Sequence, residues 1–178
     1  MGNVPWPSHI ELLCLDVDGV LTDGSIILND RGEETKRFFV RDGTAIRAWL
    51  ACGFHLAVIT ARPIGASQHR LSSLGVSHIY ADVDDKGAIF ERLCSQLNVD
   101  PARAAMVGDD LADLSVFRRC GCPIAVGDAV DEIKAAALLT TKAVGGRGAV
   151  RESIEGLLKA AGRWDDVVSQ HDVSVEGV

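Results

Sequence analysis

Length, composition and charge narrow the class of protein before any motif is considered. A chain of 178 residues with 47% apolar content can bury a full core, which predicts one compact domain rather than two. The formal net charge of −7 at pH 7 argues against the broad basic face with which proteins bind nucleic acid, so we expect no nucleic-acid partner.

Two further features of the sequence bear on the cellular compartment. No apolar stretch approaches the roughly 20 residues that a membrane helix needs, and residues 1–13 lack the basic and apolar regions of a secretory signal. The cysteines are odd in number, form no CxxC pattern and mostly have apolar neighbours: Cys14, Cys52, Cys94, Cys120 and Cys122. They indicate reduced, buried thiols, so we expect a cytoplasmic protein without a membrane partner.

The first half of the chain alternates apolar strands with amphipathic segments. A strand over 10–15 is followed by two extended arms around the turn-forming sequence of 29–32, which predicts a β-hairpin within 25–40. Asp42 is placed to cap a helix that ends at Gly53. A strand over 55–59 and a helix over 63–75 follow.

The second half continues the alternation, with strands over 76–80, 104–107, 123–126 and 138–141 and helices over 85–97, 111–119, 130–137 and 149–161. Because the strands are apolar on both faces, the pattern predicts an α/β fold: a Rossmann-like open parallel sheet with helices on both faces. The predicted domain spans 1–162, with the small hairpin over 25–40 as its insertion and no large cap domain. The polar, acidic segment 163–178 has little periodicity, so we expect a flexible tail.

Polar side chains follow four of the predicted strands, at the point where each strand ends. In an open parallel sheet these points lie at one edge, where ligands bind. We therefore expect six residues to converge: Asp16, Asp18, Thr60, Lys86, Asp109 and Asp110. Gathered carboxylates repel one another, and a hard divalent ion such as Mg²⁺ offsets this repulsion while binding phosphate oxygens. The pattern therefore predicts a metal-assisted phosphoryl site, in which Thr60 and Lys86 donate to the phosphoryl group.

Four short motifs carry a family resemblance. DVDGVLT at 16–22, VIT at 58–60, Lys86 and GDDLAD at 108–113 resemble the four motifs of the haloacid dehalogenase superfamily of phosphatases. The sequence also resembles one family in particular, the 3-deoxy-D-manno-octulosonate 8-phosphate (KDO 8-phosphate) phosphatases. This resemblance includes further stretches such as FVRDGTAIR at 39–47 and GGRGAVRE at 145–152. The resemblance implies a Mg²⁺-dependent phosphoric monoester hydrolase that converts KDO 8-phosphate to KDO and phosphate.

The resemblance also implies a role for each site residue. Asp16 attacks phosphorus to form an aspartyl-phosphate, and Asp18 is the general acid and base. Thr60 and Lys86 hold the phosphoryl oxygens. Mg²⁺ is bound by three groups, the carboxylates of Asp16 and Asp109 and the backbone carbonyl of Asp18. Two further aspartates orient waters and Lys86, namely Asp110 and Asp113.

The substrate contacts that the resemblance implies extend beyond the phosphate, to Asp18, Val40, Arg41, Asp42, Gly43, Arg47, Arg62, Arg70 and Lys86. The four arginines among them predict an anion site suited to the carboxylate of a sugar acid. Because the hairpin is too short to close over the site, we expect neighbouring subunits to supply the missing walls in a homotetramer. The apolar hairpin residues would lie in the subunit contacts, namely Ile26, Ile27, Phe38 and Phe39.

Three other interpretations stay open at this point. A related nine-carbon sugar acid 9-phosphate differs from KDO 8-phosphate by contacts that no motif reports. A non-catalytic receiver domain also gathers acidic residues, a Thr and a Lys at strand ends, but its phosphorylated Asp follows the third strand. An inactive copy kept for oligomerisation is disfavoured by the intact set of site residues. The GGRG stretch at 145–148 is either a flexible loop before the last helix or a substrate gate.

Overall fold

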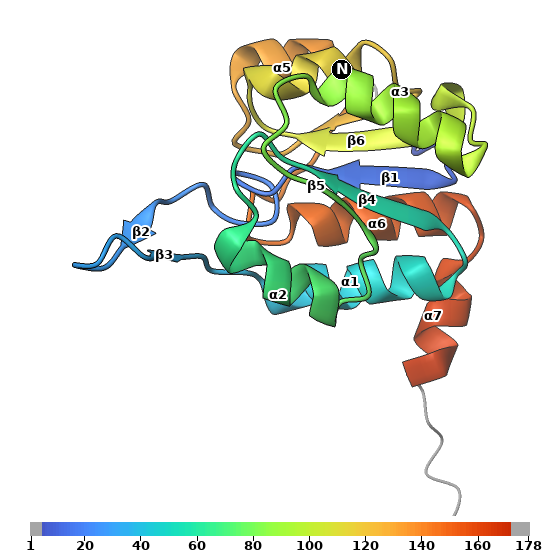
Figure 1. Ribbon diagram of the computed structural model, residues 1–178. Coiled ribbons are helices and arrows are strands. Elements are labelled where there is room, and N and C mark those ends of the chain that lie inside the picture. Colours follow the sequence, from blue (N-terminus) through green and yellow to red (C-terminus); the bar gives the residue numbers. More distant parts are fainter. Residues whose placement is uncertain (1–4, 172–178) are drawn as a thin grey trace, which may run out of the picture.

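The computed structural model describes residues 5–171, and these build a parallel sheet with helices on both faces (Figure 1). The strand order is β5-β4-β1-β6-β7-β8, and every neighbouring pair is parallel. The strands are β1 (Leu12–Leu15), β4 (His55–Ile59), β5 (His78–Tyr80), β6 (Ala104–Gly108), β7 (Cys122–Ala125) and β8 (Leu139–Thr140). The predicted α/β fold class is therefore confirmed, and every predicted strand of the sheet is present.

The central strand is apolar on both faces because it is covered on both faces. All four residues of β1 are fully buried, and Leu13 lies opposite Leu56 on one side and Ala105 on the other. Figure 1 shows α1 and α6 on one face of the sheet and α3 and α5 on the other. The helical segments are α1 (Val40–Ala51), α2 (Gly65–Ser73), α3 (Lys86–Leu97), η1 (Pro101–Arg103), η2 (Leu111–Asp113), α4 (Leu114–Phe117), α5 (Asp131–Ala136), α6 (Ala149–Ala160) and α7 (Trp164–His171). This packing places the carboxyl ends of β1, β4 and β6 side by side.

The predicted hairpin is present as two short antiparallel strands, β2 (Ile27–Leu28) and β3 (Glu34–Thr35). Its turn is closed by Asn29, whose side-chain oxygen accepts hydrogen bonds from the backbone N–H groups of Arg31 and Glu33. Such a local bond from an Asn side chain is typical of a tight turn. The hairpin projects from the sheet beyond the ends of the strands (Figure 1), and no large cap domain is present among the described residues.

Two local predictions differ from the structure. The helix predicted over 111–119 is a 3₁₀ turn, η2, followed by the single turn of α4, which ends at Phe117. Helix α1 begins at Val40, two residues before its predicted cap Asp42. The carboxylate of Asp42 instead accepts hydrogen bonds from the backbone N–H groups of Gly148 and Arg151, at the start of α6. Asp42 therefore caps a helix more than a hundred residues away.

The segment directly after Arg163 forms a helix, whereas the sequence predicts a flexible tail there. Residues Trp164–His171 form α7, which packs against α6. The guanidinium of Arg151 lies 4.7 Å from the centre of the Trp164 ring, and Val167 is buried. A cation over an aromatic face and one buried apolar residue give the helix a packed side. The rest of the predicted tail, 172–178, lies outside the described residues, and within 5–171 no helix has the length and apolar character needed to span a bilayer.

Candidate active site

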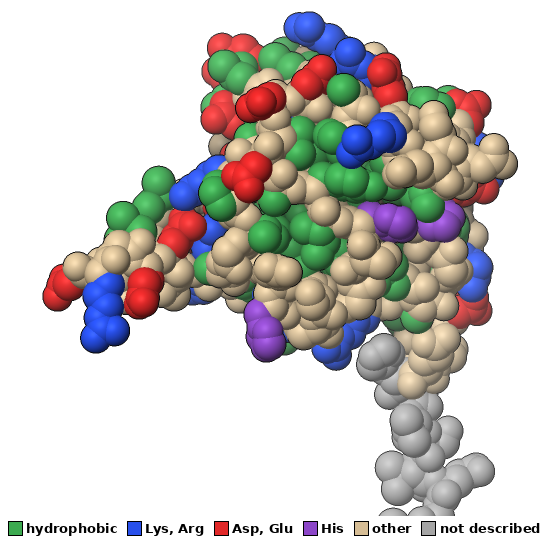
Figure 2. Space-filling view, in the orientation of Figure 1, with side chains coloured by type: hydrophobic (Ala, Val, Ile, Leu, Met, Phe, Trp, Pro, Cys, Tyr) green, Lys and Arg blue, Asp and Glu red, His purple; other side chains and the backbone are tan. Residues whose placement is uncertain are grey.

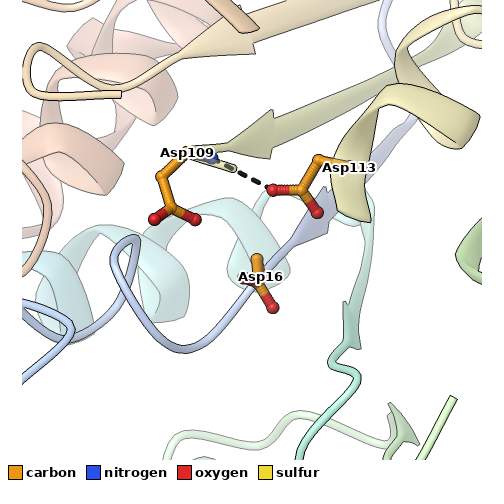
Figure 3. A group of neighbouring side chains, drawn as sticks. All are labelled: Asp16, Asp109 and Asp113. Carbon is orange, nitrogen blue, oxygen red and sulfur yellow. Dashed lines mark hydrogen bonds between the residues drawn. The ribbon is translucent and has the colours of Figure 1, made fainter. Parts of the chain in front are cut away.

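Three aspartates from different elements meet at the carboxyl end of the sheet (Figure 3). Asp16 directly follows β1, Asp109 directly follows β6, and Asp113 is the last residue of η2. Each offers a carboxylate oxygen, and these oxygens lie within 4.8 Å of one another. The convergence expected from the strand order is therefore present for Asp16 and Asp109.

Asp113 is fully engaged by protein groups. One of its carboxylate oxygens accepts a hydrogen bond from Lys86 Nζ at 2.7 Å, and the other accepts one from the backbone N–H of Asp109 at 3.0 Å. Both oxygens thus accept hydrogen bonds from protein groups, so Asp113 orients Lys86 and the backbone of Asp109. Its neighbour Asp110 is exposed and accepts a hydrogen bond from the backbone N–H of Leu111.

Lys86 lies between two carboxylates in the interior of the site. It is the first residue of α3, which Asp85 caps, and its side chain is only 3% exposed. Its Nζ is 2.9 Å from Asp16 Oδ1 and 2.7 Å from Asp113 Oδ1. Burial lowers the pKa of Lys86, but the charges of Asp16 and Asp113 outweigh burial and raise it above its usual value. Lys86 therefore stays charged.

The carboxyl groups of Asp16 and Asp109 are harder to ionise than usual. Burial and the nearby charge of Asp113 raise the pKa of Asp16 to about 6, although Lys86 acts in the opposite direction. Burial and the charges of Asp16 and Asp113 raise the pKa of Asp109 to about 8. Asp109 Oδ1 is buried and accepts no hydrogen bond from the described residues. A buried oxygen without a donor, beside a second carboxylate, is the chemistry that fits a hard divalent cation.

The loop after β1 packs closely against the Asp109 side chain at Gly19, where there is no space for a Cβ atom. Gly19 has φ of +86°, and a Cβ added there would lie 1.9 Å from Asp109 Oδ2. Behind this loop lies the GGRG stretch: a Cβ on Gly145 would lie 1.7 Å from the carbonyl oxygen of Gly19, and Gly146 N–H donates to the Val20 carbonyl. Asp128 holds the Gly145 N–H at 2.9 Å. The GGRG loop therefore supports the backbone of the loop after β1 that carries the DxD motif, Asp16-Val17-Asp18, called the DxD loop below; sequence reasoning did not identify this role.

The second aspartate of the DxD motif lies under the hairpin. Both oxygens of Asp18 are 2.8 Å from Lys36 Nζ, and Arg62 is 3.7 Å away. Thr60 is buried, and its hydroxyl oxygen accepts a hydrogen bond from the backbone N–H of Arg62. Sequence reasoning missed Lys36 because it lies 18 residues from Asp18, outside every motif.

The predicted substrate contacts lie in four separate places. Arg62 lies beside Asp18, and Asp42 is buried under α6. Arg47 and Arg70 line a groove of about 410 Å³ together with Val40, Gly43 and residues of α7. Arg41 lines another hollow, with residues of α6. Neither of these two hollows is lined by the carboxylates described above, so within the described chain Arg41, Arg47 and Arg70 are not brought to Lys86.

The fold and this carboxylate and lysine arrangement define a hydrolase of the haloacid dehalogenase type, and a model of the haloacid dehalogenase-like hydrolase family matches residues 72–152. The KDO 8-phosphate phosphatase KdsC of Escherichia coli K12 is 42% identical over 162 residues, which cover 91% of this chain and 86% of that protein. The chain belongs to the KDO 8-phosphate phosphatase family.

Two crystal structures of that family are closely similar to the structure of this chain. The phosphatase from Moraxella catarrhalis, in complex with magnesium ion, phosphate ion and KDO, has a TM-score of 0.90 and 39% identity, covering 93% of this chain and 95% of that chain. The phosphatase from Yersinia pestis has a TM-score of 0.87 and 38% identity, covering 89% and 85%. The similarity therefore extends over nearly the whole described fold.

Proposed function

We propose that this chain is a Mg²⁺-dependent phosphatase that hydrolyses KDO 8-phosphate to KDO and inorganic phosphate. The observation that carries the proposal is the cluster of buried Asp16, Lys86 and Asp113 with half-buried Asp109 at the carboxyl end of the sheet. The name of the Escherichia coli relative and the ligands of the Moraxella catarrhalis relative support the substrate and the metal.

The residues present fit a magnesium ion. Asp16 and Asp109 have carboxylate oxygens close to each other, and burial together with the charges of neighbouring carboxylates raises the pKa of each. We assign the ion to these two carboxylates and the backbone carbonyl of Asp18. When bound, Mg²⁺ neutralises charge that would otherwise repel an anionic substrate from a carboxylate nucleophile.

The protein groups divide the reaction between them. Asp16 attacks phosphorus and forms an aspartyl-phosphate as the sugar alcohol leaves. Asp18 gives a proton to that alcohol and then takes one from the water that hydrolyses the intermediate. Lys86 and Thr60 stabilise the phosphoryl oxygens, and Asp113 holds Lys86 in place for this role.

The division of the arginines supports an oligomeric active site. Arg62 lies next to Asp18 in the same chain, whereas Arg47 and Arg70 line a groove away from the carboxylates. We propose that the enzyme is a homotetramer in which the groove of one subunit faces the phosphate site of another. Substrate carboxylate would then meet arginines of both subunits, for which the planar guanidinium is well suited.

Exposed apolar residues on the hairpin support the same assembly. Ile26 and Leu28 are 63% and 61% exposed, and Val40 at its base is 75% exposed. Figure 2 shows hydrophobic side chains gathered on the projecting hairpin. Phe38 and Phe39, by contrast, are half-buried, so Ile26 and Ile27 are the predicted contact residues with more surface to offer. Apolar surface of this kind marks a protein interface.

A cytoplasmic location is part of the proposal. All five cysteines are unpaired, and burial raises the pKa of three of them, Cys94, Cys120 and Cys122, to about 11 or 12. Buried protonated thiols without disulfides are usual in a reducing compartment.

Phosphate release from KDO 8-phosphate tests the proposed function. Wild type should release phosphate in the presence of Mg²⁺ and stop when the ion is removed with a chelator. Asp16→Asn should abolish turnover without changing the circular dichroism spectrum, because the amide is not a nucleophile. Activity of Asp16→Asn within tenfold of wild type would contradict the assigned nucleophile.

A further inference from the structure

The hairpin brings a buried ammonium to the second aspartate of the DxD motif. Lys36 comes directly after β3, yet its side chain is only 2% exposed. Its Nζ lies 2.8 Å from both carboxylate oxygens of Asp18, whose side chain is 16% exposed. Burying an ammonium without a partner is costly, so the pair holds Lys36 and Asp18 in one arrangement.

A second ion pair braces the first. Arg62 donates to Glu34 of β3 at 2.8 Å and lies 3.7 Å from Asp18. Negative and positive groups therefore alternate along Glu34, Arg62, Asp18 and Lys36. Both ends of this chain of charges come from the hairpin, while its centre belongs to the catalytic face of the sheet. The position of the hairpin and the orientation of Asp18 are thus coupled.

Arg37, the next residue along the chain, forms an ordinary exposed ion pair and so provides a comparison for Lys36. Arg37 forms an ion pair with Asp23, but the Arg37 side chain is 64% exposed. Exposed pairs of this kind contribute little, because water screens them. Lys36 differs from Arg37 in burial, in its contact with both oxygens of one carboxylate, and in the identity of that carboxylate.

We propose that Lys36 is a positioning residue that fixes the Asp18 carboxylate toward the leaving alcohol. This inference rests on the proposed function, in which the Asp18 backbone carbonyl faces the metal ion and its side chain serves the leaving group. A carboxylate that can rotate is in the productive orientation for only part of the time, and small misplacements of a proton donor lower the rate steeply. Lys36 restricts that rotation.

Three variants test the proposal by phosphate release from KDO 8-phosphate with Mg²⁺ present. Lys36→Met keeps the length of the side chain but removes the charge, and it should lower kcat by about ten- to a hundredfold. KM and the inhibition constant of inorganic phosphate should stay within about threefold, because the phosphate pocket keeps Lys86 and Thr60. Lys36→Arg should recover much of kcat. Arg37→Met is the matched control and should retain wild-type kinetics.

A leaving group that needs no proton separates positioning from a general structural effect. The first turnover of p-nitrophenyl phosphate releases nitrophenolate without help from an acid, so Lys36→Met should change this burst rate by no more than about threefold. A burst slowed as much as KDO 8-phosphate turnover would overturn the proposal. So would a tenfold higher KM with unchanged kcat, which would make Lys36 a substrate anchor.

The folding of the variants and the proposed function are controlled separately. Circular dichroism and phosphate binding report whether Lys36→Met folds, and Lys36→Gln replaces it if it does not. A wild type that releases no phosphate would overturn the proposed function itself. Wild-type turnover matched by Lys36→Met would overturn only the role of Lys36.

Discussion

Asp109 shows at the scale of a single residue how the site depends on a cation. Burial and the charges of Asp16 and Asp113 raise its pKa to about 8, and that of Asp16 is raised to about 6. A carboxyl whose pKa is raised on folding favours the folded state below the unfolded pKa near 4, and this contribution is lost as the pH rises through the folded value. The free energy of unfolding of the Mg²⁺-free enzyme should therefore fall as the pH rises from about 4 to 8, and bound Mg²⁺ should offset this loss.

Melting temperatures with and without Mg²⁺ check this expectation. Stabilisation by Mg²⁺ should be larger at pH 8 than at pH 6, because at pH 6 protons compete for Asp109. Asp109→Asn should melt higher than wild type in Mg²⁺-free buffer, by about 2–4 °C for each kcal/mol gained, and should no longer respond to Mg²⁺. Asp131→Asn, an exposed change of the same charge on α5, should do neither. Equal stabilisation of Asp109→Asn by Mg²⁺ would rule out Asp109 as a ligand.

At the scale of elements, the GGRG loop packs against the DxD loop and holds its backbone in place. Gly145 packs against the Gly19 carbonyl with no space for a side chain. Gly145→Ala should displace the loop that carries Asp16 and Asp18, and we expect kcat/KM to fall by at least tenfold. Gly65→Ala, at an exposed position with open space around it, is the control and should retain activity. An active Gly145→Ala enzyme would show that the two loops move independently.

The sequence was sufficient for features that depend on local patterns. The strands were predictable because apolar runs end at polar or glycine residues, and Asp16, Thr60 and Asp109 follow from the strand ends. The cap that Asp42 gives to α6 could not be predicted, because the hydrogen-bond partners of Asp42 lie 106 and 109 residues away in the sequence. Lys36 was missed for the same reason. Helix α7 was missed because its packed side consists of few apolar residues, among them Trp164 and Val167.

At the scale of the whole molecule, the hairpin is the surface that most needs a partner. We expect light scattering to give the mass of a tetramer at micromolar concentration. Ile27→Asp should lower that mass, because a charge in an apolar contact must be desolvated. Arg31→Asp, at the polar turn of the same hairpin, should leave the mass unchanged. A wild-type monomer would contradict the proposed assembly.

The proposed arrangement of subunits bears directly on the choice of substrate. If arginines of two subunits bind the carboxylate of the sugar acid, Arg62→Ala and Arg70→Ala should each lower kcat/KM for KDO 8-phosphate by about ten- to a hundredfold, or roughly 1.4–2.7 kcal/mol. The burst rate of p-nitrophenyl phosphate, which has no carboxylate and a leaving group that needs no proton, should change little.

The most direct test of the account compares kcat/KM for KDO 8-phosphate with that for neutral hexose phosphates and for a nine-carbon sugar acid 9-phosphate, by phosphate release with Mg²⁺ present. If the arginines bind the substrate carboxylate as proposed, the wild-type enzyme should prefer KDO 8-phosphate, and the nine-carbon acid as well, over the neutral sugars by at least about tenfold. Equal efficiency toward neutral hexose phosphates would contradict the account and leave a general small-molecule phosphatase.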